Sequence, residues 1–346
     1  MNHTKGKRGI ILMNLGSPDS TSVKDVRRYL NEFLMDERVI DIPWLQRTLL
    51  VKGIITPFRA SKSAHAYKTI WTKDGSPLIV LSKQLQKAVQ EKVDDPVEIA
   101  MRYGNPSPAV AFEALLNKVK DLEEVVLFPL YPHYALASYE TAVEYAMSIY
   151  KKKKYTFKLT VVPPYFNDAG YIHALSESMR PYLREEYDHI LFSYHGIPAR
   201  HLHNRDVSQV QQCVQSGSCA IGGAGKNKNC YRFEVFETTR LVTQALQIPK
   251  EKFSVSFQSR LGKGWLEPFT DIRLEQMPKE GIKKLLIISP AFVSDCLETL
   301  EELEMRGKET FINAGGESYK MIPCMNVHPA WVDVVARLSS GVTQPV

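Results

Sequence analysis

The sequence lacks long apolar runs, a strong excess of one charge and an even set of cysteines. Its longest apolar stretches, 125–130 and 285–288 with its continuation, are each broken by proline and fall far short of the ~20 residues that span a bilayer. Lys and Arg number 44 against 38 Asp and Glu, and this net charge of +6 argues against a nucleic-acid partner. Five cysteines in 346 residues argue against a disulfide scaffold and favour a reducing compartment.

The amino-terminal residues also lack the pattern of a secretion signal. Lys5, Lys7 and Arg8 precede the apolar run 10–13, but this run is shorter than the roughly 7–15 residues of a signal core. Polar and turn-forming residues follow it where a small-residue cleavage site would be needed. We therefore expect a cytoplasmic protein.

Four short apolar runs predict buried strands of parallel sheets. They cover residues 9–13, 125–128, 189–192 and 285–288, and each is rich in Ile, Val and Leu without alternation. Helical patterns lie between these runs, at 110–119 and 231–246. Alternating strands and helices indicate an α/β fold.

The predicted strands repeat one plan along the chain. The first and third lead into the turns 16–18 and 196–198, whereas the second and fourth stop at Pro129 and Pro290. This repetition predicts two related α/β domains, and the alternative is chance, because Gly and Pro commonly close strands. The expected division is an amino-terminal domain 1–165, a carboxy-terminal domain 166–325 that carries the chemistry, and a final helix within 326–346 that packs back on the body.

The glycine-containing turns do not match a nucleotide-binding loop. The turn after the first strand has Gly16 alone rather than G-x-G-x-x-G. The stretch 222–225 does not follow a predicted strand, and Asn227 stands after Lys226 where a phosphate-binding loop has Ser or Thr. We therefore expect no nucleotide cofactor.

Chemistry in an open α/β sheet is expected beyond the carboxyl ends of the strands. His195 follows the third strand beside Gly196, and a neutral imidazole there can bind a metal or take a proton near pH 7. Asp295, Glu298 and Glu302 follow the fourth strand at spacings that place them on one face of a helix. Together the two segments predict a histidine and a column of carboxylates in one cleft.

Each segment also has a purely structural interpretation. A lone histidine is more commonly a hydrogen-bonded structural residue than a ligand. Asp295 followed by Glu298 is a capping-box pattern, in which both acids stabilise the start of a helix. The residues alone leave both interpretations open.

Several segments resemble the ferrochelatase family, whose members insert ferrous iron into a porphyrin. The two most specific are 191–198, Leu-Phe-Ser-Tyr-His-Gly-Ile-Pro, and 294–302, Ser-Asp-Cys-Leu-Glu-Thr-Leu-Glu-Glu. Further matching segments are 14–18, 102–104, 131–132, 257–260, 265–268 and 270–271. The likeness extends over nearly the whole chain and implies two similar Rossmann-like domains of the chelatase type.

The resemblance implies a lyase of heme biosynthesis that uses protoporphyrin IX and ferrous iron as substrates and forms protoheme. A coproporphyrin ferrochelatase or another tetrapyrrole chelatase is the first alternative. A carrier of tetrapyrrole or metal that performs no chemistry is the second, and the missing signal peptide argues against its periplasmic form.

The same resemblance assigns roles to the residues at the strand tips. His195 is the catalytic histidine, and Glu298 is the carboxylate opposite it, so that the two make a weak nitrogen and oxygen site for iron. Which of them takes the pyrrole proton stays open. Asp295 and Glu302 extend the acidic face as a route for protons or hydrated metal.

The porphyrin requires apolar walls, and its propionates require cations. The matching segments supply the expected wall residues, with two arginines as carboxylate partners: Met13, Tyr103, Tyr131, Trp265 and Phe292, with Arg59 and Arg102. For each aromatic residue, core packing is the alternative. Such walls are expected to act by saddling the ring, so that a pyrrole lone pair turns toward the metal.

Three cysteines lie close together after the histidine motif, at Cys213, Cys219 and Cys230. By resemblance to ferrochelatases that carry a two-iron two-sulfur cluster they are candidate cluster ligands, although a fourth cysteine is missing nearby. A zinc ion completed by His201 or His203 is a second interpretation, and three unligated thiols are the third.

The stretch 44–58 is apolar and carries two further interpretations. One is a weak peripheral membrane contact, because the product of the implied reaction is poorly soluble. The other is an ordinary lid packed on its domain. The oligomeric state is not indicated by the sequence.

Overall fold

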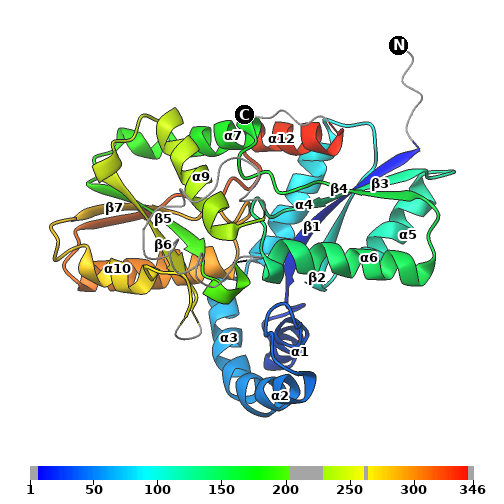
Figure 1. Ribbon diagram of the computed structural model, residues 1–346, viewed down its shortest axis with the longest axis horizontal. Coiled ribbons are helices and arrows are strands. Elements are labelled where there is room, and N and C mark those ends of the chain that lie inside the picture. Colours follow the sequence, from blue (N-terminus) through cyan, green and yellow to red (C-terminus); the bar gives the residue numbers. More distant parts are fainter. Residues whose placement is uncertain (1–6, 203–228, 261–263, 342–346) are drawn as a thin grey trace. The chain divides into compact units, whose positions relative to one another are not determined.

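The computed structural model describes residues 7–202, 229–260 and 264–341. The chain divides into two compact units, each containing one sheet (Figure 1). The boundaries between the units fall at Tyr131/Pro132, Ala135/Leu136, Pro163/Pro164 and Trp331/Val332. The short segment 132–135 therefore belongs to the second unit, although the residues on both sides of it belong to the first.

The first unit is built on a four-stranded parallel sheet in the order β2-β1-β3-β4. Its strands are β1 (Arg8–Ser17), β2 (Val97–Gly104), β3 (Glu124–Pro129) and β4 (Lys158–Val161). Helices α4 (Pro77–Gln90), α5 (Pro108–Lys118) and α6 (Thr141–Lys153) pack against β1. The other helical segments of this unit are α1 (Val23–Leu34), α2 (Trp44–Thr48), the π-helix η1 (Leu49–Ile55), α3 (Thr56–Ile70) and the π-helix η2 (Leu136–Glu140).

The second unit repeats this topology. Its parallel sheet has the order β6-β5-β7-β8, built from β5 (His189–His195), β6 (Phe253–Gln258), β7 (Lys284–Ile288) and β8 (Ser318–Met321). Its main helices are α7 (Ala169–Met179), α9 (Tyr231–Ala245), α10 (Thr270–Gln276), the π-helix η6 (Glu298–Gly307) and α11 (Lys308–Asn313). Short 3-10 turns are η3 (Tyr182–Arg184), η4 (Ala199–His201) and η5 (Lys250–Lys252). Helix α12 (Pro329–Ser339) contains the unit boundary at Trp331/Val332. The shared strand order confirms two similar Rossmann-like halves.

All four strands predicted from the sequence are present, and they are the two central strands of each sheet, β1, β3, β5 and β7. The predicted helices 110–119 and 231–246 are confirmed as α5 and α9. The strands that the sequence did not reveal, β2, β4, β6 and β8, all lie at sheet edges. Edge strands are partly exposed, as in β4, which has no fully buried residue, so they lack the continuous apolar run of a central strand.

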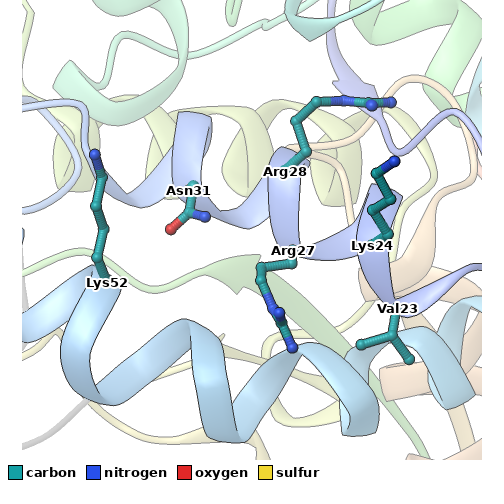
Figure 2. Close-up of a pocket in the computed structure, with 6 residues that line it drawn as sticks. All are labelled: Val23, Lys24, Arg27, Arg28, Asn31 and Lys52. Atoms are coloured by element: carbon teal, nitrogen blue, oxygen red, sulfur yellow. The ribbon is translucent and has the colours of Figure 1, made fainter.

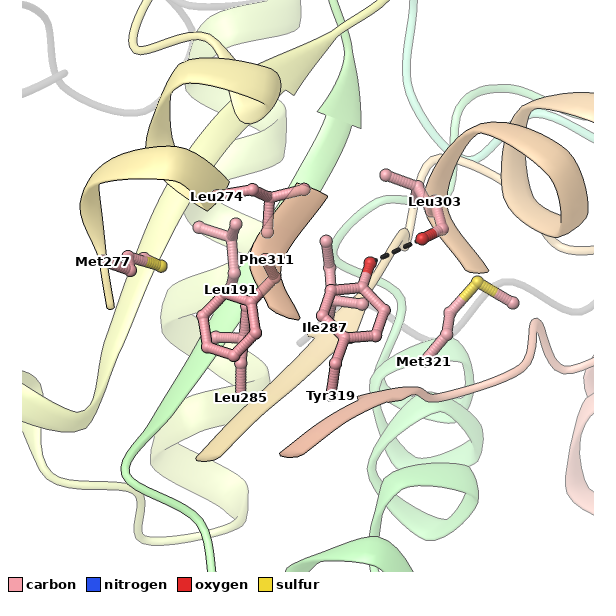
Figure 3. Close-up of a cluster of buried hydrophobic side chains, with 9 residues drawn as sticks. All are labelled: Leu191, Leu274, Met277, Leu285, Ile287, Leu303, Phe311, Tyr319 and Met321. Atoms are coloured by element: carbon pink, nitrogen blue, oxygen red, sulfur yellow. Dashed lines mark hydrogen bonds between the residues drawn. The ribbon is translucent and has the colours of Figure 1, made fainter. Parts of the chain in front are cut away.

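One face of the second sheet is closed by a compact apolar cluster (Figure 3). Its members come from β5, β7 and β8 and from the helical segments over them: Leu191, Leu274, Met277, Leu285, Ile287, Leu303, Phe311, Tyr319 and Met321. The Tyr319 hydroxyl donates a hydrogen bond of 2.6 Å to the Leu303 carbonyl and so ties β8 to η6. Side chains alternate along a strand, so His195, four residues beyond Leu191, points to this same face of β5.

Helix α9 covers the opposite face of β5. Tyr194, next to His195, lies 2.7 Å from Thr239 of α9 through their hydroxyl groups. The same buried face of α9 carries Glu234, which accepts a 2.6 Å hydrogen bond from the Tyr134 amide. Burial raises the pKa of Glu234 to about 8, so this carboxyl is protonated and neutral at pH 7.

Replacing Glu234 with Gln is expected to stabilise the protein increasingly as the pH rises from about 5 to about 8. The pKa of Glu234 is about 8 when folded and 4.5 in its ordinary state, so the folded chain holds an extra proton over that range and its free energy of unfolding falls as the pH rises. Glutamine has no proton to lose and still accepts from Tyr134. Thermal unfolding followed by circular dichroism should show a melting-temperature gain of roughly 2–4 °C at pH 8 and almost none at pH 5.

Glu237→Gln is the matched control on the same helix. Glu237 makes a 2.7 Å ion pair with Arg240, whose side chain is 57% exposed, so its replacement should give no pH-dependent gain. A gain for Glu234→Gln that is equal at pH 5 and pH 8 would contradict a buried neutral carboxyl.

Candidate active site

The backbone at the end of β5 approaches β6 so closely that it requires glycine at position 196. His195 is the register partner of Gln258, and the next amide, that of Gly196, donates a 2.8 Å hydrogen bond to the Gln258 carbonyl. A Cβ on Gly196 would lie 2.7 Å from that carbonyl oxygen and 3.4 Å from the Trp265 ring. Glycine therefore lets the two strand ends and the indole pack together beside His195.

The imidazole of His195 is partly exposed and has one nitrogen committed to the backbone. Nδ1 lies 2.7 Å from the Gly196 carbonyl oxygen. A carbonyl only accepts hydrogen bonds, so Nδ1 carries the proton and Nε2 keeps its lone pair. This contact therefore favours the tautomer that can take a proton or bind a metal at Nε2.

Two predicted wall residues lie beside this imidazole. The Phe292 ring centroid is 6.3 Å from that of His195, in an edge-to-face arrangement. Trp265 pairs with Pro198 through a β-bridge. The backbone amide of Leu266 donates a 3.0 Å hydrogen bond to the Ile197 carbonyl. The loop after His195 is thus tied to the segment that presents the indole.

The π-helix η6 carries the two predicted acids Glu298 and Glu302. A π-helix has more residues per turn than an α-helix, so residues four apart lie nearly one above the other. Burial and the nearby Glu298 charge raise the pKa of Glu302, while Ser259, Arg306 and His195 act in the opposite direction. Both Glu298 and His195 are therefore close enough to act on Glu302 electrostatically.

Glu302 is held at both carboxylate oxygens. The Ser259 hydroxyl donates a 2.6 Å hydrogen bond to Oε2, and the Arg306 guanidinium lies 3.2 Å from Oε1. Ser259 has a φ of 62°, a left-handed conformation that costs a non-glycine residue about 1 kcal/mol or more. Ser259 lies in the matching segment 257–260, but neither its φ nor its partner can be read from residue types.

Asp295 lies before the π-helix that carries Glu298 and Glu302, and the N-cap residue of this helix is Leu297. The Asp295 carboxylate is buried and accepts three hydrogen bonds. The donors are the Asn326 side-chain amide at 2.6 Å, the Thr299 hydroxyl at 3.0 Å and the Cys324 backbone amide at 3.2 Å. Asp295 therefore anchors the turn before η6 to the segment after β8.

The predicted porphyrin-binding residues of the first unit are mostly inside its core. Met13 and Tyr103 are fully buried, and Tyr131 is 8% exposed. Arg102 pairs with Asp36, hydrogen-bonds the Thr141 hydroxyl and stacks over the Tyr103 ring. Arg59, on α3, is exposed. These positions support a packing role for Met13, Tyr103 and Arg102, and they leave Arg59 as an exposed guanidinium.

The predicted cluster or zinc site falls mainly outside the described residues. Cys213, Cys219 and His203 belong to the part of the chain that is not described. Cys230 is buried and directly precedes α9, and His201 is buried in η4. Within 7–202, 229–260 and 264–341, no group of three or more His, Cys, Asp or Glu side chains is arranged to hold a metal ion.

The chain is similar to known ferrochelatases over nearly its whole length. The ferrochelatase family profile matches residues 7–341. The ferrochelatase of Opitutus terrae is 48% identical over 334 residues, 95% of this chain and 96% of the relative. The ferrochelatase of Pseudomonas entomophila is 47% identical over 331 residues, 95% of this chain and 97% of the relative.

Solved structures show the same fold at much lower identity. SirB from Bacillus subtilis with Fe3+ has a TM-score of 0.54 at 11% identity, over 97% of both chains. The sirohydrochlorin chelatase SirB from Bacillus subtilis subspecies spizizenii in complex with cobalt has a TM-score of 0.53 at 10% identity, also over 97% of both chains. With the family match and the two close relatives, the chain belongs to the ferrochelatase family, lyases that insert a metal ion into a porphyrin.

Proposed function

We propose that this ferrochelatase inserts ferrous iron into protoporphyrin IX and so forms protoheme. The observation that carries the proposal is the pairing, in one unit, of an imidazole with an open Nε2 and a π-helix that presents Glu298 and Glu302. Phe292 and Trp265 add aromatic surface beside the imidazole, as a flat macrocycle requires.

Metal insertion requires that two pyrrole nitrogens lose their protons. His195 is proposed as the base, because the bond from Nδ1 to the Gly196 carbonyl leaves Nε2 as the acceptor. When a pyrrole N–H bond breaks, its electron pair stays on the porphyrin nitrogen and the proton moves to Nε2. The imidazolium so formed is stabilised by the carboxylates of η6, which already interact with His195 through Glu302.

Glu298 is proposed as an oxygen ligand that receives ferrous iron on its way to the macrocycle. A site of one carboxylate and one imidazole is weak and incomplete, which suits delivery, since four pyrrole nitrogens must take the metal away. Glu302 is proposed to accept protons that leave His195. Asp295, part of the predicted acidic route, is given no step in it, since its carboxylate is engaged in three hydrogen bonds within its unit.

The remaining predicted contacts concern the propionates and the ring faces. Arg59 keeps an exposed guanidinium and is proposed to pair with a propionate carboxylate. Trp265 and Phe292 are proposed as ring contacts that favour a saddled porphyrin. Met13, Arg102, Tyr103 and Tyr131 stay predictions of the family resemblance, and their burial favours support of the walls over direct contact.

Anaerobic incubation with ferrous iron should consume protoporphyrin IX about 10-fold or more faster than coproporphyrin III. The expectation rests on apolar surroundings of His195, which suit a ring that bears fewer carboxylates. Loss of porphyrin fluorescence measures both rates under identical conditions. A faster rate with coproporphyrin III would assign the protein to the alternative substrate.

His195→Ala tests the chemistry in the same assay. Loss of the base should lower the insertion rate at least ~100-fold, while the affinity for protoporphyrin IX, measured by fluorescence quenching, changes little. His173→Ala, at an exposed position on α7, is the control and should insert iron at the wild-type rate. Equal rates for the His195→Ala variant and wild type would favour a carrier.

Glu302→Gln should slow turnover by roughly 10-fold and leave porphyrin binding intact. The amide keeps the hydrogen bond from Ser259 but cannot take a proton, so only proton removal from His195 is affected. Glu304→Gln, two residues along the same helix at an exposed position, is the matched control. An unchanged rate for Glu302→Gln would remove Glu302 from the mechanism.

We also propose a peripheral membrane contact through α2, η1 and the start of α3. Five large apolar side chains there are at least 59% exposed: Trp44, Leu45, Leu49, Ile54 and Phe58. A groove of about 610 Å³ between α1 and η1 adds positive charge, since Lys24, Arg27, Arg28 and Lys52 line it with Val23 and Asn31 (Figure 2). Among the described residues no helix is long and apolar enough to cross a bilayer. Apolar anchors beside cations are typical of binding to an anionic lipid surface.

Substitution of Trp44 and Phe58 by Ser should reduce binding to vesicles of phosphatidylglycerol and phosphatidylcholine at least ~5-fold in a sedimentation assay. Both side chains are mostly exposed, at 66% and 78%, so their loss removes membrane-facing area with little effect on the core. The control replaces Val110 and Leu116, exposed apolar residues of α5, by Ser. Equal sedimentation of both variants and wild type would contradict the membrane contact.

A further inference from the structure

The first residue of α9 contacts the backbone of the catalytic histidine. The Tyr231 hydroxyl donates a 2.8 Å hydrogen bond to the His195 carbonyl oxygen. Tyr231 is 5% exposed, and burial raises the pKa of its phenol well above the ordinary value, so the hydroxyl is protonated and remains a donor at neutral pH.

The Tyr231 ring packs against a neutral histidine, His133. His133 packs edge-to-face on Tyr231 at 6.1 Å and on Tyr194 at 5.5 Å. The Thr238 hydroxyl donates a 2.8 Å hydrogen bond to the Phe166 carbonyl. Because its hydrogen is used there, the same hydroxyl accepts from Nε2–H of His133 in their 2.9 Å contact. Burial lowers the pKa of His133 to about 3, which keeps this ring neutral. Tyr231 therefore lies against a fixed, uncharged support.

One peptide group is hydrogen-bonded at both ends, as an acceptor at its oxygen and as a donor at its N–H. The His195 carbonyl and the Gly196 amide belong to the same peptide unit, and Tyr231 binds its oxygen while the Gln258 carbonyl binds its N–H. The next carbonyl, that of Gly196, accepts from Nδ1 of the imidazole. The orientation of the ring therefore depends on the orientation of this peptide.

We propose that Tyr231 is a positioning residue for His195, which fixes the peptide after the catalytic histidine and, through the Gly196 carbonyl, the direction of Nε2. The proposal rests on the proposed role of His195 as the base. Without the phenol hydroxyl, the peptide keeps only its bond to Gln258 and can rotate about it, which displaces the imidazole while the Trp265 and Phe292 rings keep their places. Displacement of a catalytic group by about 1 Å is enough to cost up to about 100-fold in rate.

Tyr231→Phe tests the proposal because it removes one oxygen atom and keeps the ring packed on His133. The expected result is a fall in kcat of about 10-fold, with KM for protoporphyrin IX and for ferrous iron within about twofold of wild type. Tyr150→Phe is the matched control. It removes a phenol hydroxyl that donates a 2.5 Å hydrogen bond to the Phe157 carbonyl in the first unit, and it should leave kcat unchanged.

A spectroscopic readout separates this proposal from the proposed function. In protein labelled with 13C-histidine, the His195 ring signal is identified by its absence from His195→Ala, and it should shift or broaden in Tyr231→Phe but not in Tyr150→Phe. This result is expected whichever porphyrin the enzyme accepts. If Tyr231→Phe does not fold, Thr238→Val, which loosens the His133 support, should give the same signal change with a kcat loss of about threefold.

Two outcomes would overturn the proposal. One is a Tyr231→Phe variant with wild-type kcat and an unmoved His195 signal. The other is a rise in KM at unchanged kcat with an unmoved signal, which would place Tyr231 on the substrate-binding surface.

Discussion

The close approach of β5 and β6 at Gly196 is the constraint on which the active site depends. The Gly196 amide donates a 2.8 Å hydrogen bond to the Gln258 carbonyl, and a side chain at position 196 would collide with that same oxygen. The contact sets the peptide that orients His195. It also sets the end of β6, where the left-handed backbone of Ser259 directs a hydroxyl to Glu302. One backbone contact therefore positions both the His195 imidazole and a carboxylate that interacts with it.

The two faces of the second sheet differ in charge near this contact. Glu298 and Glu302 of η6 act on the His195 side of β5, whereas the other side holds Glu234 of α9 and His133 of the segment 132–135, which are both neutral at pH 7. The buried layer on the α9 side of β5 therefore adds no charge at pH 7.

The sequence was sufficient for the central strands, because an uninterrupted apolar run is a local feature. The roles of His195, Glu298 and Glu302 stay predictions, drawn from reactive residues that follow strand tips. The capping-box pattern at Asp295 did not reveal that the helix it precedes is a π-helix, Glu298–Gly307, whose N-cap residue is Leu297. Ser259 and Tyr231 act through tertiary hydrogen bonds to residues 43 and 36 positions away. Such partners are determined by the packing of β6, η6 and α9 on β5, which no single segment encodes.

The environments of Glu298 and Glu302 separate their roles. Ser259 and Arg306 occupy the two oxygens of Glu302, so a metal ion could bind there only by displacing one of them. A proton can still be taken up, because burial and the Glu298 charge raise the pKa of Glu302 above that of an ordinary glutamate. Glu298, at the first turn of the same helix, is only partly buried. These environments support the proposed division, in which metal goes to Glu298 and protons go to Glu302, so that the two would not compete for one carboxylate.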